Sequence, residues 1–204
     1  MKHLFSIALI VLALNFSSAQ EVYLNVGRNF TTYDYTNSQG NSNPNVESSS
    51  GASYGVGYIF PMGDKFGIAA GLTLDQFNAT GGNMVNNYSW DTSYLGLQGV
   101  AKYKVLEANR SPISLNLNAG INFNHIVGGE QKINGQTFKL TEEDEFKGLF
   151  FKPIVGFDVQ YFLLDNIAIG LGYHYSKNFG LSSGEQDLNF NNSQLQFGIL
   201  MSLN

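Results

Sequence analysis

Hydrophobic and polar residues alternate strictly along several stretches of this chain. Between Ile113 and Asn124 the odd-numbered positions hold Ile, Leu, Ala or Phe, and the even-numbered positions hold Ser, Asn or Gly. A period of two residues predicts a β-strand with one apolar face and one polar face. What each face contacts decides whether the chain is a soluble β-protein or a membrane barrel.

The same alternation predicts an all-β chain of eight strands. They are expected near residues 21–35, 51–61, 65–78, 88–105, 112–127, 148–163, 166–179 and 187–203. Tight turns are expected at 61–65, 106–112 and 164–166, and longer polar loops at 36–51, 80–87, 128–147 and 180–186. Short turns at one end and long loops at the other are typical of an antiparallel up-and-down meander, and of outer-membrane barrels in particular.

The two faces of the predicted strands differ in side-chain size. In the strand near 166–179, Ile167, Leu171 and Tyr173 alternate with Gly170 and Gly172. The interior of an eight-stranded barrel is only just filled by side chains, so roughly four large residues from every strand exceed its volume. Gly makes room inside such a barrel but weakens a strand that faces water. We therefore expect the apolar face to contact lipid and the small polar face to line the lumen of a transmembrane barrel. In the alternatives, a soluble β-sandwich or a soluble lipid carrier, the apolar face would be internal.

The first residues have the pattern of a secretory signal. A charged start precedes an apolar run over residues 4–14, and the small residues Ser17 and Ala19 precede the expected cleavage site. This pattern predicts a signal peptide over residues 1–19, which leaves 20–204 as one barrel domain.

Composition narrows the function classes. The chain has no Cys, which excludes disulfides and thiolate chemistry. Its net charge is −5 and it has no Lys/Arg cluster, which argues against nucleic acid as a partner. The sequence shows no metal-ligand cluster and no phosphate-binding loop, so no metal or cofactor is expected. Beyond the signal there is no apolar run of about 18 residues, so no membrane helix is expected.

With these features the chain resembles the small, porin-like outer-membrane β-barrel family of Gram-negative bacteria, over about residues 21–204. Such barrels end in a recognition pattern of polar, x, Gly, two residues, hydrophobic, x, aromatic. The matching positions here are Gln196, Gly198, Met201 and Leu203. The departure is that Leu203 is not aromatic and one residue follows it. The resemblance implies a multi-pass outer-membrane protein inserted by the barrel-assembly machinery, with outer-membrane lipids and lipopolysaccharide as partners. We expect a monomer without a sizeable channel.

Four charged residues fall on the predicted lumen face in two tiers. Lys102 and Asp158 lie nearer the short turns, and Asp75 and Lys152 lie nearer the long loops. Because buried charges need partners, we hypothesise that each tier is an ion pair across the lumen. In the alternative, each charge contacts water.

One motif offers an enzymatic alternative. His174 and Ser176 share a strand face, so the imidazole could activate the hydroxyl. The motif is similar to the His-x-Ser of lipid A 3-O-deacylases, which implies His174 as base, Ser176 as nucleophile and Glu185 or Asp187 as orienting acid. However, alternation places the pair in the lumen, and Lys177 follows the serine where that family has Asn. The function we expect is therefore non-enzymatic: envelope structure, or surface interaction and adhesion through the external loops.

Three further residues or segments raise separate questions. Arg28 falls on the lipid face near mid-strand, where Arg costs about 2–4 kcal/mol, so either a bulge turns it inward or the membrane boundary lies elsewhere. The carboxylate run 142–145 matches no EF-hand spacing and is expected to be a solvated acidic loop, with binding of divalent cations as the alternative. Trp90 is expected to anchor the barrel at the membrane interface.

Overall fold

A computed structural model describes residues 20–36, 46–82, 87–106, 112–142, 148–180 and 187–203. This part of the chain is almost entirely β-strand. The strands are β1 (Gln20–Thr36), β2 (Val46–Met62), β3 (Phe66–Gln76), β4 (Ala79–Gly82), β5 (Asn87–Leu106), β6 (Ile113–Ile133), β7 (Gln136–Lys139), β8 (Leu149–Leu164), β9 (Ile167–Gly180) and β10 (Asp187–Leu203), with a short 3-10 helix, η1 (Leu140–Glu142). Among these residues, no helix has the length and hydropathy needed to span a bilayer.

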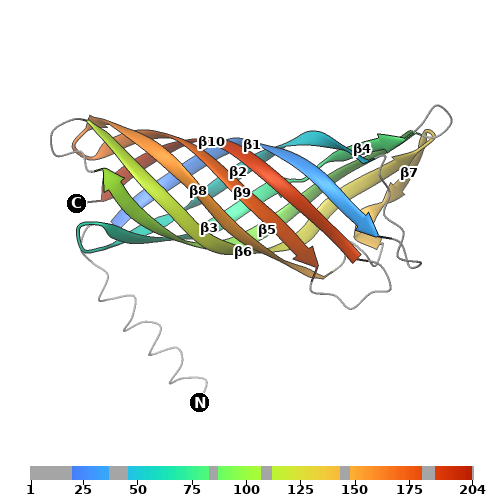
Figure 1. The fold of residues 1–204 in the computed structure, drawn as a ribbon, viewed down its shortest axis with the longest axis horizontal. Coiled ribbons are helices and arrows are strands. Elements are labelled where there is room, and N and C mark those ends of the chain that lie inside the picture. Colours follow the sequence, from blue (N-terminus) through green and yellow to red (C-terminus); the bar gives the residue numbers. More distant parts are fainter. Residues whose placement is uncertain are drawn as a thin grey trace, which may run out of the picture.

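Eight of the strands close into a ring. Antiparallel pairing runs from β1 through β2, β3, β5, β6, β8 and β9 to β10, and β10 pairs again with β1. The strands tilt around a common axis, and the short turns lie at the end of the barrel where the chain ends (Figure 1). Closure leaves no unpaired sheet edge in the membrane. The predicted eight-stranded up-and-down barrel is confirmed.

The two remaining strands extend the barrel beyond the predicted strand ends. β4 follows β3 and pairs with both β2 and β5, and β7 forms a hairpin with the end of β6. The hairpin turn is Asn134-Gly135, with φ of 50° and 85°, as two-residue hairpins require. The expected long loops at 36–51, 80–87 and 128–147 are therefore wrong in part. The sheet continues into the first residues of the second and third, and β2 already begins at Val46 within the first. Polar residues occupy both faces there, so the alternation ends while backbone pairing continues.

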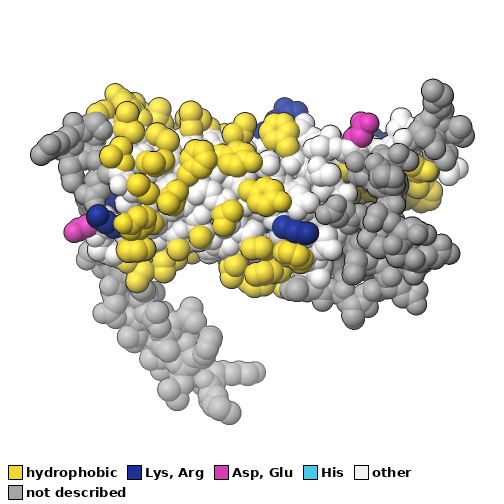
Figure 2. All heavy atoms as spheres, viewed as in Figure 1, with side chains coloured by type: hydrophobic (Ala, Val, Ile, Leu, Met, Phe, Trp, Pro, Cys, Tyr) yellow, Lys and Arg dark blue, Asp and Glu magenta, His cyan; other side chains and the backbone are white. Residues whose placement is uncertain are grey.

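The two faces point as predicted. Asn116, Asn122 and Asn124 are buried, whereas Leu117 and Ile121 are 51% and 42% exposed on the outside. Hydrophobic side chains cover the half of the barrel next to the short turns (Figure 2). β5 and β6 have 20 and 21 residues, but a membrane-spanning strand needs only about 9–11. The end of the barrel away from the short turns therefore extends beyond the apolar belt.

Candidate functional site in the barrel lumen

Inward side chains fill the lumen in four layers, whose order can be followed along β8. From the outer end toward the short turns, β8 contributes Phe150 to an aromatic layer, Lys152 to an upper ion pair, Asp158 to a lower ion pair and Phe162 to a basal apolar layer. The alternation of β8 explains this order, because every second residue points inward.

The outer aromatic layer is a cluster of buried, mostly apolar side chains inside the barrel. Its buried members are Tyr33, Phe77, Ala79, Tyr94, Ile126, Leu140, Phe150 and Phe190. The ring centres of Phe77 and Phe190 are 4.8 Å apart, and Phe150 meets Tyr94 edge-on at 5.4 Å. These are favourable aromatic geometries. The layer therefore separates the polar lumen from the outer opening.

Trp90 packs against this aromatic layer, with its ring centre 6.0 Å from that of Tyr33. The prediction that Trp90 anchors the barrel at the membrane interface is therefore wrong. Trp90 lies four residues before Tyr94 in the same strand, so both side chains point to the same face, and Tyr94 points inward.

The upper ion pair lies directly beneath the aromatic layer. Lys152 Nζ is 2.8 Å from Asp75 Oδ2, and both side chains are almost fully buried. Ser53 Oγ donates a hydrogen bond of 2.6 Å to Asp75 Oδ1. Lys152 Nζ also lies 4.9 Å from the ring centre of Phe77, a cation–π distance. Lys152 thus contacts both the Asp75 carboxylate and the aromatic layer above it.

The lower ion pair joins Lys102 Nζ to Asp158 Oδ1 at 2.5 Å. Asp158 is also the acceptor for side-chain amides of Asn116, Asn118 and Gln160, at 2.7, 2.8 and 2.9 Å. The carboxylate is therefore held by four donors, which is how a buried charge is satisfied. The structure thus brings together the two charge pairs named in the sequence hypothesis.

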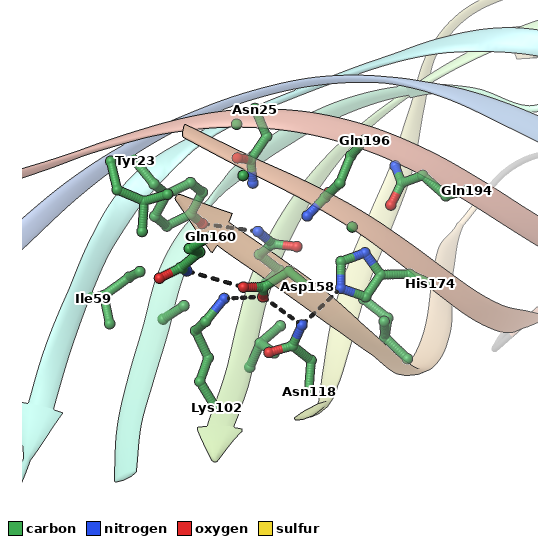
Figure 3. A pocket seen from close by; sticks show the side chains of 18 residues that line it. Tyr23, Asn25, Ile59, Lys102, Asn118, Asp158, Gln160, His174, Gln194 and Gln196 are labelled. Carbon is green, nitrogen blue, oxygen red and sulfur yellow. Dashed lines mark hydrogen bonds and ion pairs between the residues drawn. The ribbon is translucent and has the colours of Figure 1, made fainter. Parts of the chain in front are cut away.

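A small cavity lies beside the lower ion pair. It has a volume of about 60 Å³ and is lined by residues that include Lys102, Asp158, His174 and Gln196 (Figure 3). This is room for a few water molecules. The basal apolar layer lies toward the short turns and contains Tyr23, Ile59, Ala69, Val100, Ala168 and Leu200.

His174 and Ser176 both point into the lumen and are buried. His174 Nε2 lies 3.2 Å from Asn118 Nδ2, and Figure 3 shows the ring directed at that amide. Glu185 lies outside the described residues, and Asp187 is the first residue of β10. Both side chains therefore point away from the lipid, in the arrangement of a polar lumen pair.

The remaining candidate features are resolved only in part. Arg28 stays on the outward face, because β1 pairs with β2 and β10 without a register shift. It donates a 2.6 Å hydrogen bond to Ser50 Oγ.

Residues 143–145 of the acidic run lie outside the described residues. In the part of the chain that is described, no group of three or more His, Cys, Asp or Glu residues could hold a metal ion.

The sequence analysis did not predict the aromatic layer, although alternation contained a signal for it. Phe77 is two residues from Asp75, and Phe150 is two residues from Lys152. Both aromatic residues therefore share a face with charges that were assigned to the lumen.

A closed ring of eight antiparallel strands with an apolar outer belt and a filled polar lumen defines an outer-membrane β-barrel. The family model described as "Outer membrane protein beta-barrel domain" matches residues 4–199, so the chain belongs to this family and is located in the outer membrane.

Solved structures with this architecture come from several bacteria. OprG of Pseudomonas aeruginosa has 12% identity and a TM-score of 0.56, over 90% of this chain and 96% of that one. Neisserial surface protein A has 16% identity and a TM-score of 0.48, over 88% and 96%. The outer membrane enzyme PagL has 10% identity and a TM-score of 0.43, over 83% and 97%. No curated protein matches the chain by sequence. At such identities the likeness to OprG shows the fold alone.

Proposed function

We propose that this protein is a non-enzymatic outer-membrane scaffold with no large pore, which holds its external strands and loops at the cell surface for adhesion or another surface interaction. The observation that carries the proposal is the filled lumen. An aromatic layer, two ion pairs and a basal apolar layer occupy it in succession, and the cavity between them holds only about 60 Å³.

The outer end of the barrel supports the second half of the proposal. β6 and β7 form a hairpin beyond the apolar belt, and all four residues of β7, Gln136–Lys139, are exposed. Binding residues are found disproportionately on such loops, carried by a rigid scaffold. In this proposal the protein is a monomer, inserted by the barrel-assembly machinery after removal of residues 1–19. N-terminal sequencing of the mature protein tests that cleavage.

The test combines a pore assay with an attachment assay. Liposomes that contain the protein are expected to exclude sugars that enter through an open porin. Cells that express the protein are expected to attach to host-cell or matrix-coated surfaces more than cells without it. Replacing residues 131–138 by a two-residue turn is expected to reduce attachment, while heat-modifiable gel mobility shows that the barrel still folds.

Two outcomes contradict this proposal. Sugar entry into the liposomes would show that the lumen is open. Equal attachment by cells with the native hairpin, with the shortened hairpin and without the protein would exclude an adhesive role in that setting.

A further inference from the structure

Arg28 is a cation on the outward face of β1, where the apolar belt ends. Its neighbours on that face, Val26 and Phe30, are 44% and 43% exposed. Within the described residues, no carboxylate forms an ion pair with it. Its hydrogen bond to Ser50 involves one guanidinium nitrogen. An exposed guanidinium on the outward face can pair with an anionic lipid headgroup.

Other outward polar pairs identify this level as the membrane interface. Tyr173 is hydrogen-bonded to Ser193 at 3.1 Å, and Tyr175 donates to Asn191 at 3.2 Å. Tyrosines at this level are typical of the boundary between acyl chains and headgroups. Figure 2 shows basic side chains at the border of the hydrophobic region away from the short turns. Arg28 lies at the same level as Tyr173, because both are register partners of Leu195, and this places Arg28 at headgroup depth.

An apolar groove begins directly beside Arg28. Its lining includes Val26, Tyr54, Phe157, Leu171, Leu195 and Phe197. Leu195 is the register partner of Arg28, and Val26 lies two residues along β1, a rise of about 6.6 Å toward the short turns. A second groove shares Tyr54 and is lined by residues that include Leu24, Val56, Leu72 and Leu95. Two open apolar depressions on the outer surface thus meet at Tyr54, below Arg28.

We propose that Arg28 and Ser50 bind a phosphate group of lipopolysaccharide, whose acyl chains occupy the grooves on both sides of Tyr54. The planar guanidinium presents several N–H donors in a geometry that matches phosphate, and such charge-assisted bonds are strong. The long external ends of the strands place Arg28 in the outer leaflet, because short turns face the periplasm. Lipopolysaccharide is the outer-leaflet lipid that combines phosphate with several acyl chains.

The experiment measures lipid binding to the complete, folded barrel. Delipidated protein in a mild detergent is titrated with phosphorylated lipid A and with dephosphorylated lipid A, and bound lipid is counted by native mass spectrometry. Native protein is expected to bind the phosphorylated form about tenfold more tightly. Arg28→Gln is expected to remove that difference, and Arg28→Lys to retain part of it. Lys65→Gln, which removes a cation at the short-turn end, is the matched control and is expected to bind as the native protein does.

Each other result overturns the proposal. Unchanged preference for the phosphorylated form in Arg28→Gln would show that Arg28 is not the phosphate ligand. An equal loss in Lys65→Gln would show that overall charge, not this site, attracts the lipid. Phosphatidylglycerol binding as tight as that of lipid A would assign the site to phospholipid. Heat-modifiable gel mobility shows whether each variant folds. If Arg28→Gln does not fold, the preference for phosphorylated over dephosphorylated lipid A is compared in Ser50→Ala and Arg28→Lys instead.

Discussion

Lys152 Nζ lies 2.8 Å from Asp75 Oδ2 across the lumen of the barrel. The strands that carry them, β8 and β3, are separated in the ring by β5 and β6. The Lys152 side chain is 5% exposed and that of Asp75 is 1% exposed. At such burial neither charge is stable without the other, so the pair ties together distant parts of the barrel wall.

Asp75→Ala is expected to destabilise the folded barrel by about 3–5 kcal/mol, because it leaves Lys152 buried without its carboxylate. The double variant Asp75→Leu/Lys152→Met is expected to regain most of that loss, since it removes both charges. Urea-induced unfolding in lipid vesicles, followed by Trp90 fluorescence, measures both. A double variant as unstable as Asp75→Ala would contradict the prediction.

Two glycines of β5 provide a matched pair for testing lumen packing. A Cβ at Gly96 would collide with side-chain oxygens of Asn122, Asn124 and Thr73, whereas a Cβ at Gly99 meets no atom within 4 Å. Gly96→Ala is therefore expected to lower the free energy of unfolding by about 1–3 kcal/mol, the usual cost of overpacking. Gly99→Ala is expected to be neutral or slightly stabilising. Equal urea midpoints for the two variants would show that the lumen is not closely packed at Gly96.

The four filled layers predict that the barrel does not conduct ions. Native protein in planar bilayers is expected to show no stable conductance steps. The double variant Tyr94→Ala/Phe150→Ala removes the edge-on pair and is also expected to stay closed, because the two ion pairs and the basal apolar layer still fill the lumen. The control is Phe157→Ala, on the lipid face, which is expected to remain closed. Each inward truncation is also expected to lower the free energy of unfolding by about 3–5 kcal/mol. Phe190→Ala, which truncates only one ring of the layer, is therefore measured alongside in case the double variant does not fold.

Conductance steps in the native protein would show that the lumen is open, and steps in the double variant alone would show that the aromatic layer, not the layers beneath it, closes the lumen.

Ser176→Ala tests the enzymatic alternative. Lipid A extracted from cells with native protein, with Ser176→Ala, with His174→Ala or without the protein is expected to have the same mass, because both side chains are buried in the lumen. Mass spectrometry of lipid A detects the loss of one acyl chain directly. A loss that depends on Ser176 and His174 would make the protein a hydrolase and overturn the non-enzymatic proposal.

Much of the lumen was predicted from the sequence, but its outermost layer was missed. Alternation assigned Asp75 and Lys152 to the inside, because neighbouring residues of a strand must point to opposite faces. The same alternation places Phe77, Phe150 and Trp90 on the inward face, but apolar residues were expected to face lipid. The hairpin around Asn134 was missed because polar residues occupy both of its faces. Asn134-Gly135 is itself a strong hairpin signal, and it was available in the sequence.

By itself, the sequence determined the eight strands of the ring, the lipid and lumen faces, and the end of the barrel that carries the short turns. These features follow from a two-residue period and from turn composition, which are local properties of the chain. The sequence hypothesis paired Lys152 with Asp75 but left contact with water as an alternative. Only the tertiary structure decided that the two charges meet, that Trp90 packs against Tyr33, and that Arg28 lies above two grooves. Those relationships depend on the closure, tilt and stagger of eight strands. A period of two residues states which way a side chain points, but not which residues face it across the lumen or border it on neighbouring strands.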